Sequence, residues 1–243
     1  MDPTLIILLI GASGPIIGSA IGVLKKPSDK FTFGMLAFAA GVMIAISMLE
    51  LLPQAITLAP LWAVATGLGL GTILMYGVDK LIPHIHPEAC KQRMSIHRTA
   101  IFLLIGIFIH NFPEGLAIAS GTIIGFRETL IIAVAIGIHN IPEGICTSAP
   151  YYYCTKKRLE TFLLSASTAI PIVLGFVVGK FLFATISPIF VGILVSLTAG
   201  VMMYISADEL IPASISKHQS HWDRSRIFSF MIGIVFVLLL GHI

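Results

Sequence analysis

The sequence predicts an all-α membrane protein with eight transmembrane helices, arranged as three helices, two central helices, and three more that repeat the first three in inverted orientation. Three observations lead to this prediction. The 243-residue chain is 56% hydrophobic and only 11% charged, with a mean hydropathy of +0.97, whereas soluble domains carry roughly 25% charged residues. Apolar runs long enough to cross a bilayer occur eight times along the chain. Two pairs of these runs share sequence motifs.

The predicted helices follow one another with short connections. Each is a run of about 20 predominantly apolar residues, the length that spans the hydrocarbon core. The spans are 4–23, 33–52, 60–82, 100–119, 126–148, 160–181, 188–211 and 226–243. They form one transmembrane domain over residues 1–243, with a first repeat at about 1–82, central helices at about 100–148 and a second repeat at about 160–243. The first span lacks a basic start and a small-residue cleavage site, so we expect it to be retained.

Basic residues set the predicted orientation of these spans. Cytoplasmic loops of membrane proteins are enriched in Lys and Arg, and thirteen of the fifteen here lie in or beside the first, third, fifth and seventh loops. The other two are Arg127 and Lys180. The sequence therefore places the odd-numbered loops in the cytoplasm and both termini outside a cell membrane. Because the basic residues are divided among four loops, the net charge of +3 indicates topology and not nucleic-acid binding.

The second and seventh spans are related in sequence. Residues 40–55 read AGVMIAISMLELLPQA and residues 199–214 read AGVMMYISADELIPAS, identical at nine of sixteen positions. By the charge rule the two spans run in opposite directions, as inverted repeats of secondary transporters do. Packing of small residues is the alternative explanation, but it does not account for the shared Glu and Pro. The carboxylates Glu50 and Glu209 fit two interpretations, as vestibule groups that attract cations or as interfacial groups that reach water.

The loop between the third and fourth spans is rich in potential metal ligands. Two interpretations fit it equally, a weak and exchangeable metal-capture segment or a flexible polar loop, since the spacing matches no closed zinc site. Its residues of this kind are His84, His86, Glu88, Cys90 and His97. The chain has three cysteines, of which Cys90 and Cys154 fall on the predicted cytoplasmic side, so no disulfide framework is expected. The third, Cys146, is interpreted as a small packed hydrophobe, with a soft metal ligand on the ion path as the alternative.

The central spans carry the strongest functional signal, the hexapeptides HNFPEG at 110–115 and HNIPEG at 139–144. On a helix, His and Glu four residues apart stand about 40° apart on one face, and the Asn lies about 60° from the Glu. Ionisable groups at the centre of a span cost roughly 2.5 to 3.5 kcal/mol each and usually mark a functional site. A purely structural pairing of two helices is the alternative, which the duplication and the matched prolines disfavour. The candidate metal ligands are His110, Asn111, Glu114, His139, Asn140 and Glu143.

Imidazole, carboxylate and amide oxygen together suit a divalent first-row metal such as Zn, Fe, Mn or Co. We expect the ion to be a transported substrate and not a resident cofactor. An all-thiolate cage would hold zinc too tightly to release it, whereas these nitrogen and oxygen donors can bind the ion and let it go. An intramembrane metalloprotease would show HExxH, but each His here is followed by Asn, so we do not expect an enzyme. No ATP-binding P-loop is present in the sequence either, because GFVVGKF at 175–181 has the wrong spacing.

These motifs, with AGVM and ELxP in the second and seventh spans, resemble the ZIP family of metal transporters over essentially the whole chain. The resemblance implies uptake of zinc, and of Fe, Mn, Co or Cd, into the cytoplasm by an eight-span homodimer in the lipid bilayer. It implies the six ligands above, with Met43 as a thioether neighbour and with Glu114 and Glu143 between two adjacent metal positions. Family members often have a Glu before the proline of the sixth span, where this chain has Ile170. The choice between one and two metal positions therefore stays open.

The expected mechanism is alternating access, in which an ion enters from outside, loses water to the two motif faces and leaves toward the cytoplasm. A selective channel without a rocking step is the alternative. Proton linkage is expected in principle because a metal must displace protons from His and Glu. The sequence does not identify the coupling ion.

Overall fold

The computed structural model describes residues 3–24, 28–81, 111–215 and 224–242, and all regular secondary structure in them is helical. The first part of the chain forms α1 (Pro3–Leu24), α2 (Asp29–Ile46), a π-helical turn η1 (Ser47–Leu51), α3 (Leu52–Leu58) and α4 (Leu61–Leu81). A helix at 111–124 follows. The remainder forms α6 (Phe126–Thr155), α7 (Arg158–Ala166), α8 (Ala169–Thr185), α9 (Pro188–Ile205), a second π-helical turn η3 (Ser206–Leu210), α10 (Ile211–Ala213) and α11 (Arg224–Leu240).

Six helical segments of the described chain are long and apolar enough to cross a membrane, so the protein is a polytopic membrane protein. They are Thr4–Leu24, Lys30–Leu58, Leu61–Lys80, Phe126–Ala149, Arg158–Thr185 and Pro188–Ala213. Each overlaps one predicted span. The predicted span at 226–243 corresponds to α11, which has 17 residues, and the one at 100–119 lies mostly outside the described residues. The predicted end of the second span at residue 52 was wrong, because the helix continues to Leu58.

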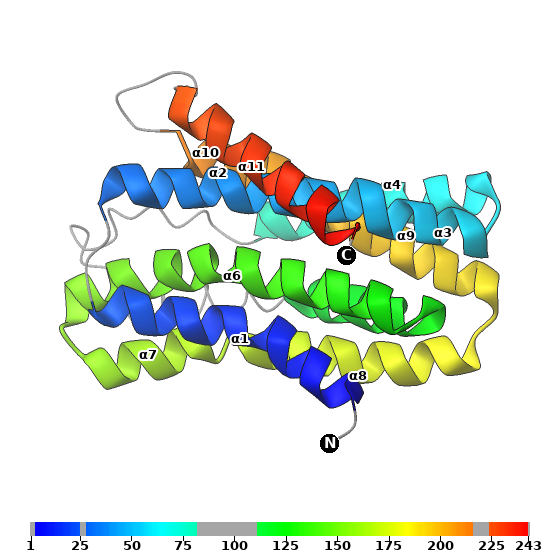
Figure 1. Ribbon diagram of the computed structural model, residues 1–243, viewed down its shortest axis with the longest axis horizontal. Helices are drawn as coiled ribbons and strands as arrows, with labels where there is room; N and C mark the ends of the chain where they lie inside the picture. The colour runs from blue at the N-terminus through cyan, green and yellow to red at the C-terminus, as the bar shows by residue number, and fades with distance from the viewer. Residues whose placement is uncertain (1–2, 25–27, 82–110, 216–223, 243) are drawn as a thin grey trace.

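The helices form two layers, which lie one above the other in Figure 1. We call α1, the helix at 111–124, α6, α7 and α8 the site layer, and α2, α3, α4, α9 and α11 the support layer. Within the layers α1 packs mainly on α6, α4 on α9, and α11 on α2. The layers meet chiefly where α2 contacts α6. The two central motifs therefore belong to the same layer.

Close helix contacts in the site layer depend on glycine. A Cβ added to Gly14 of α1 would overlap the backbone carbonyl oxygen of Gly137 and lie 2.8 Å from Cβ of Asn140, both on α6. The helix at 111–124 meets α8 in the same way, at Gly115 and Gly175. Small residues let helix backbones approach closely in membranes, where association depends on packing. These contacts bring α1 and α8 against the two motif helices.

The second and seventh spans contain matching π-helical turns. Ser47–Leu51 ends two residues before Pro53, and Ser206–Leu210 ends two residues before Pro212. Proline lacks the N–H that the ladder would use, and a widened turn is one way to accommodate the loss. The serine that begins each turn, Ser47 or Ser206, donates a 2.8 Å hydrogen bond to the carbonyl of a methionine four residues earlier. The repeat thus extends from the sequence to the backbone.

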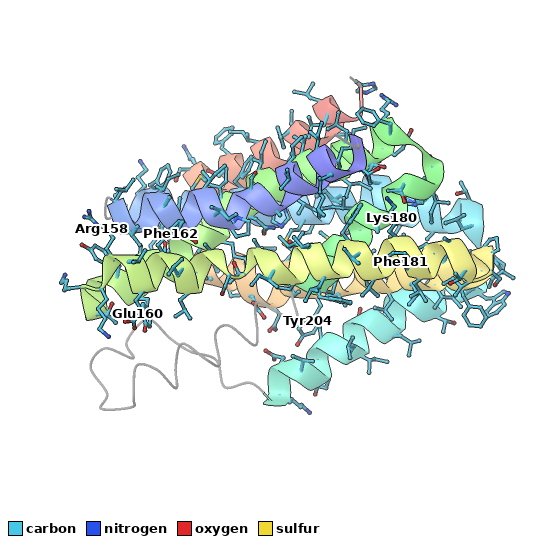
Figure 2. All side chains as sticks on the ribbon, turned by 90° about the horizontal axis from the view of Figure 1, so that it is seen from below. Arg158, Glu160, Phe162, Lys180, Phe181 and Tyr204 are labelled. Atoms are coloured by element: carbon cyan, nitrogen blue, oxygen red, sulfur yellow. The ribbon has the colours of Figure 1, made fainter. Side chains whose placement is uncertain are left out.

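The predicted sixth span at 160–181 was expected as a single helix, but the chain forms two. α7 ends at Ala166, and α8 begins at Ala169 after the turn residues Ser167 and Thr168. Pro171 has no N–H to donate to the carbonyl four residues back, which explains why the helix is interrupted there. The two helices still follow one line, with Glu160 at one end and Lys180 toward the other, as Figure 2 shows.

Candidate metal site

The centre of the site is the carboxylate of Glu114, which lies between two side chains from another helix. Nε2 of His139 is 2.9 Å from Oε1 of Glu114, and Nδ2 of Asn140 donates a 2.7 Å hydrogen bond to Oε2. Glu114 and Asn140 are 0% exposed and His139 is 1% exposed. The two sequence motifs, which are 29 residues apart, therefore meet in one buried cluster.

The imidazole of His139 is held at both nitrogens. Its Nδ1 lies 3.1 Å from the carbonyl oxygen of Ala135, one turn earlier in α6. A carbonyl only accepts, so the tautomer with hydrogen on Nδ1 satisfies this contact and leaves the lone pair of Nε2 on the side of Glu114. A carboxylate or carbonyl partner on one nitrogen commonly orients a histidine whose other nitrogen binds a metal. The contact at Nδ1 therefore points Nε2 of His139 toward the Glu114 carboxylate.

The two motif asparagines each have a buried amide oxygen. Nδ2 of Asn111 donates a 2.8 Å hydrogen bond to the carbonyl of Thr168, in the turn between α7 and α8. This bond leaves Oδ1 of Asn111 without a hydrogen-bond donor among the described residues, and the same is true of Oδ1 of Asn140. Buried polar atoms are normally paired, so such an atom calls for an explanation. The amide oxygen of Asn140, which stands beside the Glu114 carboxylate and the His139 imidazole, is a further ligand of a kind that a metal ion accepts.

The remaining predicted residues occupy different positions. Glu143 follows His139 by one turn of α6 and is partly exposed. Met43 of α2 is 0% exposed and belongs to an apolar core to which both layers contribute. His110 lies outside the described residues, as do His84, His86 and Cys90 of the predicted loop. Among the described residues no three His, Cys, Asp or Glu side chains gather closely enough to hold a metal ion by themselves.

The position that departs from the family pattern faces away from the site. Ile170 is 55% exposed on α8, whereas the neighbouring Ala169 and Pro171 are buried. What this segment contributes instead is the Thr168 carbonyl that orients Asn111. Sequence reasoning missed Thr168, although Pro171 three residues later indicated a local break in the helix.

The carboxylates of the second and seventh spans lie apart from this cluster. Glu50 of η1 is partly exposed, near enough to Arg127 and Glu128 at the start of α6 to interact electrostatically. Asp208 and Glu209 of η3 are exposed. These positions fit groups near the ends of their spans, and both interpretations of them, vestibule or interface, stay open.

Sequence comparisons connect the chain to one group of proteins. The family model described as ZIP Zinc transporter matches residues 84–241. The chain is 38% identical over 227 residues to the zinc transporter ZupT of Salmonella paratyphi A, which covers 87% of this chain and 86% of that protein. Coverage is the same for ZupT of Escherichia coli O7:K1, at 36% identity, and for ZupT of Salmonella newport, at 38%.

Proposed function

The chain belongs to the ZIP family, and from this membership we propose that it carries zinc across the cell membrane into the cytoplasm through the paired HNxPEG motifs. The relatives are named zinc transporters, so the protein is a transporter of divalent metal and not an enzyme. Zinc is then the substrate. Iron, manganese, cobalt and cadmium are further candidate substrates, because the same nitrogen and oxygen donors accept several divalent ions.

One observation carries the choice of path. The Glu114 carboxylate is completely buried and shared between His139 and Asn140 of a second membrane helix. Burying a carboxylate at membrane depth is costly and usually serves an ion path. The proposed ligands are His110, Asn111, Glu114, His139, Asn140 and Glu143, with Met43 as neighbour.

Metal binding at this cluster involves protons. The hydrogen bond between His139 and Glu114 holds a proton that must leave when a cation takes both groups as ligands. The buried amide oxygens of Asn111 and Asn140 add neutral ligands, so the ion loses water without meeting excess negative charge. Because these neutral ligands attract the cation less strongly than carboxylates do, the ion can be bound and then released.

Burial of the cluster supports a carrier over a selective channel. A channel needs a continuous hydrated path. His139, Asn140 and Glu114 are each no more than 1% exposed, so water does not reach them in this structure. Alternating access, in which the two layers change their mutual packing, brings such a site to each side of the membrane in turn.

The proposed architecture has eight spans in a 3+2+3 inverted repeat with both termini outside. Support comes from the matching π-helical turns η1 and η3, and from two corresponding helix pairs, α2 with α11 and α4 with α9. The division of the basic residues supports the orientation. A homodimer, which the resemblance implies, remains a proposal that cross-linking in native membranes tests.

Zinc flux into proteoliposomes tests the function. We expect an internal zinc-sensitive dye to report uptake with the wild-type protein, and uptake reduced to the protein-free rate with Glu114→Ala. Glu160→Ala is the matched control, because that carboxylate pairs with Lys157 at the surface and is 40% exposed. Equal flux in the wild type and in Glu114→Ala would contradict the proposed path, and no flux in the wild type with zinc binding intact would favour a sensor.

A further inference from the structure

Two polar side chains join the site layer to the support layer at one end of the molecule. Gln54 of α3 and Ser120 of the helix at 111–124 are 4% and 1% exposed. Nε2 of Gln54 donates to the carbonyl of Ser120 at 2.5 Å. The hydroxyl of Ser120 lies 2.9 Å from Oε1 of Gln54 and 2.8 Å from the carbonyl of Ala117 on its own helix, so these two acceptors share its one proton. We call this reciprocal pair the clasp. Its two hydrogen bonds connect residues that are 66 positions apart.

A second contact joins the layers near the same end. Nη2 of Arg127, at the start of α6, donates to the carbonyl of Gly241, just beyond α11. Gly241 also lies beside Glu50, because a Cβ added to it would be 3.6 Å from Oε1 of that residue. In Figure 1, α3 is at the end of the molecule opposite α7 and α10. Under the proposed topology, on which this inference rests, the clasp end is the outer end.

The opposite end has no equivalent pair in the sequence repeat. In the alignment of 40–55 with 199–214, Gln54 corresponds to Ala213. In the alignment of the two hexapeptides, Ser120 corresponds to Ala149. Alanine side chains form no hydrogen bonds, so the layers cannot be joined at the inner end in this way. The clasp is therefore a feature of one end of a molecule whose helices are otherwise repeated.

We infer that the clasp holds the outer ends of the two layers together and sets the resting state of the transporter to closed outside. Opening to the outside separates α3 from the helix at 111–124 and breaks both hydrogen bonds. Opening to the inside leaves them intact. The clasp thus favours one of the two access states without touching the metal. Replacing Gln54 is expected to raise the ratio of outward-open to outward-closed molecules by about tenfold, since each net hydrogen bond contributes a factor of a few.

The test measures the distance between the layers directly. Spin labels are attached at Ile56→Cys of α3 and Ile123→Cys of the helix at 111–124, both exposed positions, in full-length protein with its three native cysteines replaced by serine. Double electron–electron resonance in lipid nanodiscs without metal reports the two populations. Gln54→Ala removes the clasp, and Gln54→Met removes its hydrogen bonds while keeping the side-chain volume.

We expect a dominant short distance with Gln54 present and a longer one that gains about tenfold in relative population in both variants. Ser120→Ala should produce a smaller shift, because Nε2 of Gln54 can still donate to the backbone carbonyl at this position. Adding it to Gln54→Ala should produce no further shift. Thr66→Ala is the control, because that exposed hydroxyl bonds only within α4. Unchanged distances in all three clasp variants would overturn the inference. Because this readout requires no flux, a shift without zinc transport would leave the clasp standing and contradict only the proposed function.

Discussion

The two layers use their buried hydroxyl groups differently. In the site layer Ser165 of α7 lies 2.6 Å from the hydroxyls of both Ser19 on α1 and Thr147 on α6, so three helices meet at one oxygen. In the support layer Ser47 and Ser206 donate to carbonyls of their own segments, four residues back. Side-chain bonds thus fix the relative register of the site-layer helices, whereas the support layer depends more on apolar packing. A metal site needs the fixed register, because its ligands come from different helices.

The largest effect should come from the ligands themselves. His139→Ala removes the ring that joins the two motif helices, and Glu143→Ala removes a carboxylate one turn away, so each should lower zinc flux by more than about 100-fold. Both variants should still insert and migrate as a single species in size-exclusion chromatography. Wild-type flux in both would show that the site layer does not contain the path.

Disrupting the close contact between helix backbones in the site layer should have the next largest effect. Gly14→Ala places a methyl group against Gly137 and Asn140, so α1 must move away from α6. We expect a loss of about 1–3 kcal/mol in unfolding free energy and weaker zinc binding. Unfolding in mixed micelles measures the first and isothermal titration the second.

Gly77→Ala in α4 is the matched comparison, since a Cβ there meets nothing within 4 Å. It should be neutral or slightly stabilising, because alanine favours helix more than glycine does. Equal destabilisation by Gly14→Ala and Gly77→Ala would contradict the close packing described for the site layer.

The smallest predicted effect is the difference in stability between removing a hydroxyl that bonds across helices and removing one that bonds within its own helix. Ser165→Ala removes the shared partner of Ser19 and Thr147 and should cost about 1 kcal/mol. Ser206→Ala removes a bond within one segment and should cost less than about 0.5 kcal/mol. Denaturant titration of the two variants in the same detergent tests this order. The reverse order would remove the contrast between the layers.

Much of the fold and part of the site could be predicted because the signals are local. Apolar runs identify the described spans, and the paired hexapeptides identify the residues that bring Glu114 to His139 and Asn140. The ZIP assignment, made from the motifs, is confirmed by the family match over 84–241. These features depend on the length of a single helix and on the spacing of residues along one of its faces, both of which can be read from the sequence.

The features that were missed depend on how the backbone responds to proline and on contacts between distant segments. Pro53 and Pro212 were noted as a shared pattern, but the sequence does not say that the chain absorbs them as π-helical turns. At Pro171 the loss of an N–H interrupts the helix, and the carbonyl of Thr168, in the turn that results, accepts a hydrogen bond from Asn111. The clasp of Gln54 with Ser120 joins two polar residues in apolar spans that only tertiary packing brings together.

The central claim is that both motif helices supply ligands to one buried metal site. Zinc K-edge X-ray absorption of the zinc-loaded protein, compared with its His139→Ala variant, tests it most directly. We predict a nitrogen and oxygen shell at about 2.0–2.1 Å with imidazole scattering beyond it, and a smaller imidazole contribution in the variant. A sulfur shell near 2.3 Å, or an unchanged spectrum in the variant, would contradict the account.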